Sequence, residues 1–98
     1  MATIRRTDEF SDWLENLRDL RARAKIVARI DRLALGNPGD VAPVGGGVSE
    51  MRIHYGPGYR VYFVHRGADI VILLCGGDKG SQASDIVTAK KLANELED

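Results

Sequence analysis

The first third of the chain carries hydrophobic residues at helical spacing. Two apolar stripes recur every three or four positions and predict two amphipathic helices. They are formed by Phe10, Trp13, Leu14, Leu17 and Leu20 in the first helix, and by Ala24, Val27, Ile30 and Ala34 in the second. We expect a helical hairpin that turns around residues 19–21, with Thr7 or Asp8 as the first N-cap. One long helix is the alternative, because no Gly or Pro interrupts the segment.

The middle of the chain changes to strand-like runs separated by glycine-rich turns. Residues 36–39, Gly-Asn-Pro-Gly, end the helical region, and a loop is expected from there to the three glycines at 45–47. Apolar and polar residues then alternate in three segments, which predict strands at 48–55, 59–66 and 69–75. The short segment 2–6 is a further candidate strand. A last helix is expected after Ser81 or Ser84, with Ile86, Ala89, Ala93 and Leu96 as its apolar positions.

This order, β-αα-βββ-α, predicts an α+β fold. We expect an antiparallel twisted sheet with the helical pair packed on one face and the other face partly open. Ninety-eight residues are enough for one modest core, so we expect residues 1–98 to form a single domain.

Composition and charge exclude several classes of protein. Lys+Arg and Asp+Glu are both 14, so the net charge is zero, unlike the strongly basic balance of a free-standing nucleic-acid binder. Residues 18–32 are nevertheless basic and residues 81–98 acidic. The single cysteine, Cys75, excludes an internal disulfide, and we expect it to be buried. No apolar run has membrane-spanning length and the N-terminus lacks a signal-peptide core, so we predict a cytoplasmic protein.

Strand alternation gathers polar side chains on the open face of the expected sheet. Four positions pack on the helices in this arrangement: Met51, Ile53, Val61 and Phe63. The opposite face then presents Arg52, His54, Arg60 and Tyr62, with Asp78 and Lys79 following at the end of strand 69–75. Cations that hold a phosphate and a ring that stacks on a base suit RNA binding.

The stretch LCGGDKGSQ, residues 74–82, does not have the spacing of a phosphate-binding loop of nucleotide-binding proteins. We interpret it as a strand-ending turn whose glycines let an RNA backbone approach Lys79, although a turn alone would also explain them. The two histidines, His54 and His65, have no carboxylate pair at zinc-ligand spacing, so we predict neither a metal nor a cofactor.

The chain resembles a known family along three stretches. They are GVSEMRIHYGPGYRVYF (47–63), IVILLCGGDKGSQASDI (70–86) and AKKLANEL (89–96). These are similar to RelE/ParE-superfamily toxins of type II toxin–antitoxin modules, and within them to the HigB-like branch described as addiction-module killer proteins. The resemblance covers nearly the whole chain and implies the RelE-like fold.

The resemblance also implies an activity and partners. RelE-like toxins cleave mRNA, usually on the ribosome, and are held inactive by a cognate antitoxin. This antitoxin is often a helix-turn-helix protein, so DNA would be contacted only through the toxin–antitoxin complex. In such toxins basic residues on the central strands and after the last strand bind the scissile phosphate. Arg60 and Lys79 match two of these positions, and Arg52 lies where basic residues recur.

The expected chemistry is metal-independent attack of a 2′-OH on the neighbouring phosphorus. Alignment of the reacting oxygens and stabilisation of the developing charge lower the barrier. We predict that Arg60, Lys79 and Arg52 stabilise the charge and that His54 transfers a proton. The candidate substrate ligands are Tyr62, Asp78, Gln82 and Asp85. The C-terminal tyrosine of many relatives has no counterpart here, because all three tyrosines lie in the segment 55–62.

Several alternatives remain open on the sequence. The chain could be a ParE-like poison of DNA gyrase, or a non-toxic subunit that binds the antitoxin and modulates its operon. Arg52 could simply pair with Glu50 or with a helix acid, and Lys79 could be an ordinary turn lysine. The cations of residues 18–32 could be a solvated helix face, or they could contact ribosomal RNA or an acidic antitoxin segment.

Overall fold

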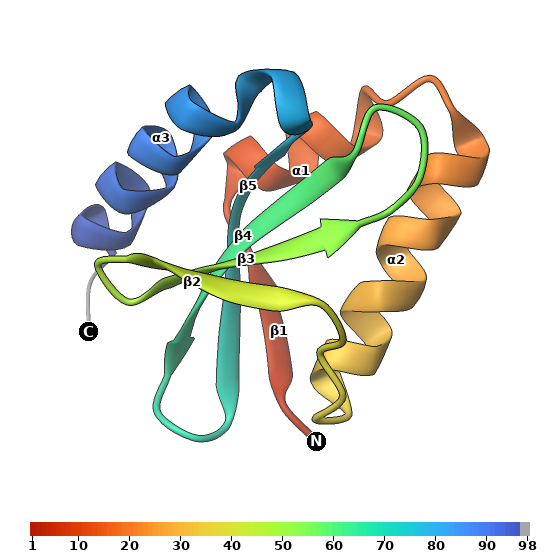
Figure 1. The fold of residues 1–98 in the computed structure, drawn as a ribbon. Coiled ribbons are helices and arrows are strands. Elements are labelled where there is room, and N and C mark those ends of the chain that lie inside the picture. Colours follow the sequence, from red (N-terminus) through yellow and green to blue (C-terminus); the bar gives the residue numbers. More distant parts are fainter. Residues whose placement is uncertain (97–98) are drawn as a thin grey trace.

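One five-stranded sheet with helices on both faces forms the protein (Figure 1). The computed structural model describes residues 1–96; Glu97 and Asp98, two of the acidic residues at the C-terminal end, lie outside the described residues. In chain order the elements are β1 (Thr3–Arg6), α1 (Asp8–Glu15), α2 (Leu20–Ala34), β2 (Val41–Gly45), β3 (Val48–Ile53), β4 (Tyr59–Arg66), β5 (Ile70–Gly77), a 3₁₀-helix (Lys79–Ser81) and α3 (Gln82–Glu95). None of the described helices is long and apolar enough to cross a membrane.

The strand order is β1-β5-β4-β3-β2. Strands β2 to β5 are antiparallel neighbours, and β1 adds to β5 in parallel. The expected α+β, RelE-like arrangement is therefore confirmed, with two differences. The parallel pairing of β1 makes the sheet mixed, and the segment expected to be a loop contains β2.

Strand β2 escaped prediction because its sequence, VAPVG, has the composition of a loop. It lies at the edge of the sheet, where a proline costs no ladder hydrogen bond on the outer side. Its register with β3 shifts between Pro43 and Gly45. Pairing with β3, rather than intrinsic preference, makes this segment a strand.

The helical hairpin is confirmed, and two side-chain caps define it. The Thr7 hydroxyl accepts a hydrogen bond from the Phe10 backbone N–H at 3.0 Å and begins α1. The Asp19 carboxylate accepts from the backbone N–H groups of Arg21 and Ala22 at 3.0 and 3.1 Å and begins α2. Such caps replace the hydrogen bonds that the first turn of a helix lacks. Two helices therefore form where the apolar pattern alone also allowed one.

The buried face of α2 shares Ile30 with the predicted stripe but contains Ile26 and Leu33 in place of Val27 and Ala34. Its buried residues are Ala22, Ile26, Ile30 and Leu33, whereas Val27 is 39% exposed. Apolar residues stand in adjacent pairs here, Ile26 with Val27 and Leu33 with Ala34, so two stripes were possible. Contact with the sheet selects the one that buries the larger side chains.

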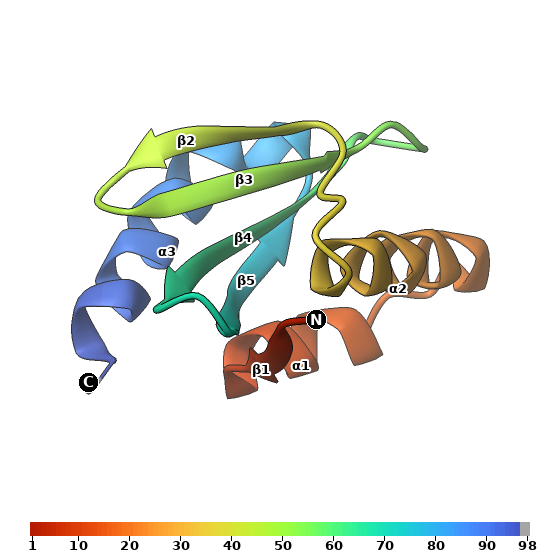
Figure 2. The same ribbon diagram turned by 90° about the horizontal axis from the view of Figure 1, so that it is seen from below.

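The two faces of the sheet bury separate cores. Helices α1 and α2 cover one face and α3 lies against the other (Figure 2). The helical-pair core contains the four strand positions expected there, Met51, Ile53, Val61 and Phe63. The core under α3 contains Val48, Tyr62, Val64, Leu74, Cys75, Ala89 and Ala93. The face expected to be partly open is therefore covered by α3 over part of its area.

The glycines of LCGGDKGSQ have a packing role that the sequence interpretation did not foresee. Strand β5 continues to Gly77, so Gly76 and Gly77 belong to the strand rather than to the turn after it. A Cβ at Gly76 would overlap the Trp13 ring, and one at Gly77 would overlap the Asp85 carboxylate. Close packing within the protein, rather than the approach of an RNA backbone, accounts for these two glycines.

Candidate functional site

A buried carboxylate, Glu50, lies at the centre of the polar surface formed by β3 and β4. Its side chain is 1% exposed. Four side chains donate hydrogen bonds to its two oxygens. They are Arg52 Nε and Arg60 Nη1 to Oε1, at 3.0 and 2.8 Å, and Tyr62 Oη and Gln82 Nε2 to Oε2, at 3.1 and 2.8 Å. A buried charge of this kind is tolerated only because every oxygen is hydrogen-bonded and the charge is paired.

Strand register explains why these side chains meet. Glu50 lies opposite Tyr62 and Arg52 lies opposite Arg60, so all four project from the same face of the β3–β4 pair. Two like charges directly opposite each other repel. The Glu50 carboxylate stands between the guanidinium groups and removes this repulsion. Arg52, Arg60 and Tyr62 share one face, as expected, whereas His54, the fourth residue expected there, follows the end of β3 at Ile53 and is outside the paired register.

The surroundings of Glu50 favour its ionised form. Burial acts to raise the pKa of Glu50, but the hydrogen bonds from Gln82 and Arg52, the charge of Arg60 and the Tyr62 hydroxyl together lower it below its ordinary value. The carboxylate therefore acts as a fixed negative charge that holds the two arginines.

Tyr62 does not have the role expected from the sequence. Its ring is completely buried in the core under α3, so it presents no face on which a base could stack. Burial and the adjacent Glu50 charge raise the pKa of Tyr62, which keeps the phenol protonated as a hydrogen-bond donor. Tyr62 therefore donates a hydrogen bond to Glu50 from within the core, and its assignment as a stacking residue is wrong.

The two arginines differ in exposure. The Arg60 side chain is 14% exposed, and its Nε is buried without a hydrogen-bond partner in the described part of the chain. The Arg52 side chain is 38% exposed and also approaches the Asp40 carboxylate at 3.5 Å. Both guanidinium groups are thus held in place by carboxylates, and Arg52 is the more accessible of the two.

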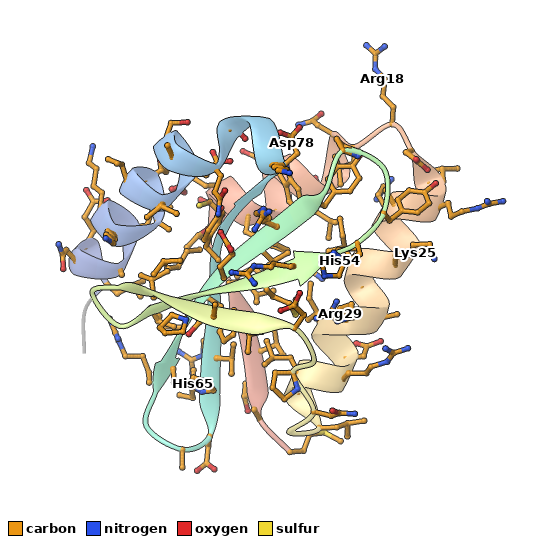
Figure 3. All side chains as sticks on the ribbon, viewed as in Figure 1. Arg18, Lys25, Arg29, His54, His65 and Asp78 are labelled. Atoms are coloured by element: carbon orange, nitrogen blue, oxygen red, sulfur yellow. The ribbon has the colours of Figure 1, made fainter. Side chains whose placement is uncertain are left out.

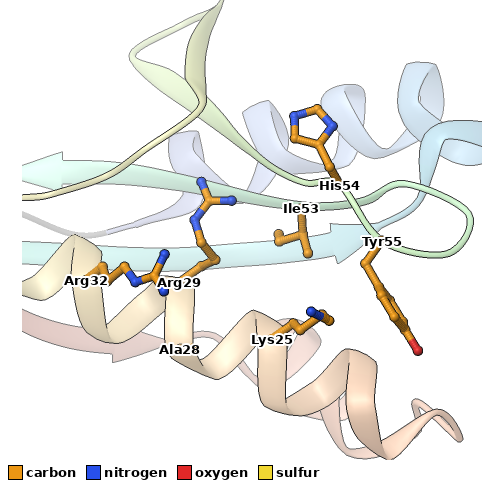
Figure 4. Close-up of a pocket in the computed structure, with 7 residues that line it drawn as sticks. All are labelled: Lys25, Ala28, Arg29, Arg32, Ile53, His54 and Tyr55. Carbon is orange, nitrogen blue, oxygen red and sulfur yellow. The ribbon is translucent and has the colours of Figure 1, made fainter.

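His54 follows β3, and Figure 4 shows its ring turned away from α2, although it lines the same pocket as Lys25 and Arg29. Figure 3 shows Arg18 projecting from the α1–α2 connection. His54 Nε2 lies 2.6 Å from Asp40 Oδ2, and its side chain is 77% exposed. This hydrogen bond, opposed by some desolvation and helped by the charge of Arg52, lowers the pKa of Asp40. Asp40 therefore links His54 to the Arg52 side chain.

The segment after β5 places Lys79 near the turn between β3 and β4. Lys79 is exposed in the 3₁₀-helix, and its Cβ lies 3.5 Å from the position that a Cβ on Gly58 would occupy. Arg60 pairs with Gly77, two residues before Lys79. Two strand arginines and an exposed lysine thus come from neighbouring segments, as the sequence led us to expect.

Asp78, Asp85 and Gln82 have structural contacts in this region. Asp78 Oδ1 accepts from the backbone N–H groups of Gly80 and Ser81 at 2.8 and 3.3 Å, which caps the 3₁₀-helix. Asp85 Oδ2 accepts from the Ser81 hydroxyl at 2.5 Å. Gln82 donates to Glu50 and so ties the start of α3 to the arginine pair. Their assignment as substrate ligands stays a prediction.

Glu50 is the centre of this cluster, and the sequence analysis considered it only as a partner for Arg52. The signal was present, because the alternation in VSEMRI places Glu50 on the face of Arg52. That Glu50 also binds Arg60, Tyr62 and Gln82 depends on the pairing of β3 with β4 and on the position of α3.

Two further observations concern possible metal ligands and the single cysteine. Within residues 1–96, no three His, Cys, Asp or Glu side chains are grouped so that they could hold a metal ion. Cys75 is buried, as expected, and burial raises its pKa to about 12, helped by the charges of Asp85 and Glu9. The thiolate that a nucleophilic cysteine needs is therefore disfavoured.

The fold and the site define a small RelE-like α+β protein with an arginine pair anchored on a buried glutamate. The family model described as Phage derived protein Gp49-like (DUF891) matches residues 12–96. The chain therefore belongs to the Gp49-like family. It is 54% identical over 93 residues to an uncharacterized protein of Haemophilus influenzae strain KW20 Rd, covering 95% of this chain and 94% of that protein. No solved structure matches the chain.

Proposed function

We propose that this protein is the toxin of a type II toxin–antitoxin module and cleaves mRNA without a metal ion. The proposal assigns the Gp49-like family to the RelE/ParE superfamily, which the RelE-like order of helices and strands supports. The protein would act in the cytoplasm, on the ribosome or on free mRNA.

The arginine pair is the observation that carries the proposal. Arg52 and Arg60 lie directly opposite each other and share Oε1 of Glu50, which fixes both guanidinium groups before any ligand binds. A planar guanidinium can donate two hydrogen bonds to the oxygens of a phosphate. Because Glu50 already fixes its position, no reorganisation energy is needed when charge develops in the reaction. Two cations brought together on neighbouring strands, at the expense of burying a carboxylate, suit a site that binds phosphate.

The proposed reaction begins with attack of a ribose 2′-OH on the adjacent phosphorus, and the 5′-oxygen leaves. Arg52, Arg60 and Lys79 would stabilise the extra negative charge on the phosphoryl oxygens. For proton transfer we propose His54, because Asp40 contacts both the His54 ring and Arg52 and so connects it to the arginine pair. His54 would accept the proton of the 2′-OH and return it to the departing 5′-oxygen, which leaves a 2′,3′-cyclic phosphate and a 5′-hydroxyl.

The expected partner is a cognate antitoxin, which would inhibit the toxin by binding to it. A helix-turn-helix protein is our proposal for it, and operator DNA would be contacted through the complex. Such a partner could cover the arginine pair directly or could block access to it from the adjacent turn at residues 56–58.

Primer extension on total RNA after a short pulse of expression tests the activity. We expect new cuts within translated messages for the wild type and none for the Arg60→Ala, Lys79→Ala double variant. The Arg18→Ala, Lys91→Ala double variant removes the same charge from two exposed positions and serves as the control. Cuts that persist in the Arg60→Ala, Lys79→Ala variant would remove these residues from the mechanism.

A non-toxic, antitoxin-binding subunit is the second candidate. The burial of Tyr62 and the low exposure of Arg60 favour it, because both leave fewer groups available to a substrate. In the same experiment this function predicts neither cuts nor growth arrest. Growth arrest with intact RNA would instead point to poisoning of DNA gyrase.

A further inference from the structure

A second basic surface lies beside the arginine pair, between α2 and the end of β3. It is an open pocket lined by Lys25, Ala28, Arg29, Arg32, Ile53, His54 and Tyr55 (Figure 4). The three permanently charged residues recur at intervals of four and three along α2, so they lie on one face of the helix. Ile53, His54 and Tyr55 come from the end of β3 and the turn that follows, and the His54 ring is turned away from α2 in Figure 4.

The charges of this pocket are not balanced by its own residues. No acidic residue lines it. In the part of the chain that the structure describes, no carboxylate lies within ion-pairing distance of Lys25, Arg29 or Arg32. The neighbouring acids contact other residues. Asp40 contacts His54 and Arg52 and acts on Arg29 only through its charge, and Asp19 accepts from the Tyr55 hydroxyl at 3.0 Å. Three like charges on one helix face cost stability unless an outside anion compensates them.

Arg29 is held in position by neutral groups. Its Nη1 donates to the Arg52 carbonyl at 2.6 Å and its Nη2 to the Pro38 carbonyl at 3.0 Å. Gly39 is in the left-handed region at φ +73°, and a Cβ there would lie 2.9 Å from Arg29 Nη2. The local backbone thus leaves room for the guanidinium and orients it through neutral groups, although the charge of Asp40 also acts on it.

The pocket also contains an aromatic ring. Lys25 Nζ lies 5.2 Å from the centre of the half-buried Tyr55 ring. Cations interleaved with an aromatic face are the combination by which proteins hold a single-stranded nucleic acid without sequence preference.

We propose that this α2 pocket binds phosphates of a single-stranded RNA and extends the surface of the arginine pair. The pocket is on the α2 side of the sheet and the arginine pair on the α3 side, and the two are linked at the edge of β3 through Asp40, which contacts His54 of the pocket and Arg52 of the pair. The proposal rests on the proposed function in that it takes RNA as the ligand. It adds that Lys25, Arg29 and Arg32 bind phosphates of the RNA at a distance from the phosphate that is cleaved, and that Tyr55 contacts a base. The link to the arginine pair and the presence of the ring favour RNA over an acidic peptide.

Fluorescence anisotropy with a short, fully 2′-O-methylated single-stranded RNA tests the pocket. The proposed 2′-OH attack cannot cut this probe, so binding is measured separately from cleavage. The Lys25→Gln, Arg32→Gln variant removes two exposed charges and spares the anchored Arg29. The Arg18→Gln, Lys91→Gln variant has the same net charge as the Lys25→Gln, Arg32→Gln variant and controls for the effect of the protein's total charge on RNA binding. Purified ribosomes as a second ligand distinguish a free RNA strand from ribosomal RNA.

We expect the Lys25→Gln, Arg32→Gln variant to bind the probe about tenfold more weakly, or worse, at low salt, and the logarithmic salt slope to fall by about 0.7 per cation removed. The control should stay close to the wild type. A loss seen with the probe, with or without a loss on ribosomes, would support RNA phosphates in the pocket. Equal binding by the two variants, or no RNA binding by the wild type, would overturn the proposal. Unchanged RNA binding with lost binding of a poly-glutamate peptide would assign the pocket to an acidic protein segment instead.

The two proposals fail separately. If the wild type makes no cuts in cells but its probe binding depends on Lys25 and Arg32, the nuclease assignment fails and the pocket stands. If cuts depend on Arg60 and Lys79 but both charge variants bind the probe equally, the pocket fails and the nuclease stands.

Discussion

Arg52 and Arg60 face each other across β3 and β4, and both donate to the same oxygen, Oε1 of Glu50. The arrangement is stable only while the carboxylate is charged, because loss of that charge would leave the largely buried Arg60 guanidinium without its counter-charge. Four predictions concern this cluster and the tight packing next to it.

Replacement of Glu50 with Gln should lower the free energy of unfolding by about 3–5 kcal/mol, because two arginines then face each other without a counter-charge. Urea denaturation measures the loss. Glu15→Gln, at an exposed position at the end of α1, is the matched control and should change stability little. A loss of similar size in both variants would show that Glu50 does not hold the cluster.

Replacement of Tyr62 with Phe should cost about 1–3 kcal/mol, because Glu50 Oε2 loses one of its two donors inside the core. For a domain of this size each kcal/mol corresponds to a melting temperature lower by roughly 4–8 °C. Thermal unfolding followed by circular dichroism measures the shift. Tyr59→Phe removes a hydroxyl from a ring that packs against Trp13 and is the control. Equal melting temperatures for the two variants would contradict the role of the Tyr62 hydroxyl.

The pH dependence of stability should carry the signature of Glu50. Its pKa is lower in the folded protein than the ordinary 4.5 of an unfolded chain. The stabilisation is therefore complete above about pH 4.5 and is lost as the pH falls through the lower folded pKa. The stability difference between wild type and Glu50→Gln should be constant from pH 7 to near 4.5 and should narrow below it.

Asp19 and Asp40, whose pKa values are also lowered, are present in both proteins of that comparison. Their contributions largely cancel in the difference, which isolates Glu50. A difference that stays constant down to pH 3, measured by denaturant titration, would mean that Glu50 is not the group that titrates.

Replacement of Gly77 with Ala should destabilise by about 1–3 kcal/mol, because the new methyl group has no room beside Asp85. The Gly77→Ala, Asp85→Ala double variant should recover part of this loss, since the overlapping carboxylate is gone. A double-mutant cycle from urea denaturation gives the coupling. Purely additive losses would show that the clash is relieved elsewhere.

The helices, the strands other than β2, the cap at Thr7 and the alternation along β3 and β4 could be predicted because each depends on neighbouring residues, and the cap at Asp19 has the same local origin. The caps at Thr7 and Asp19 need only the next three positions. The common face of Arg52 and Arg60 follows from the two-residue period of a strand. These features are local, so the sequence by itself determined them.

Other features depend on contacts between distant segments, and only the tertiary structure decided them. Strand β2 exists because β3 pairs with it, and the buried face of α2 was chosen by the sheet from two adjacent stripes. The burial of Tyr62 under α3 turned an expected stacking ring into a support for Glu50. Gln82 reaches Glu50 across 32 positions of the sequence. Periodicity shows which face a side chain takes, but which segment covers that face depends on how the whole chain packs.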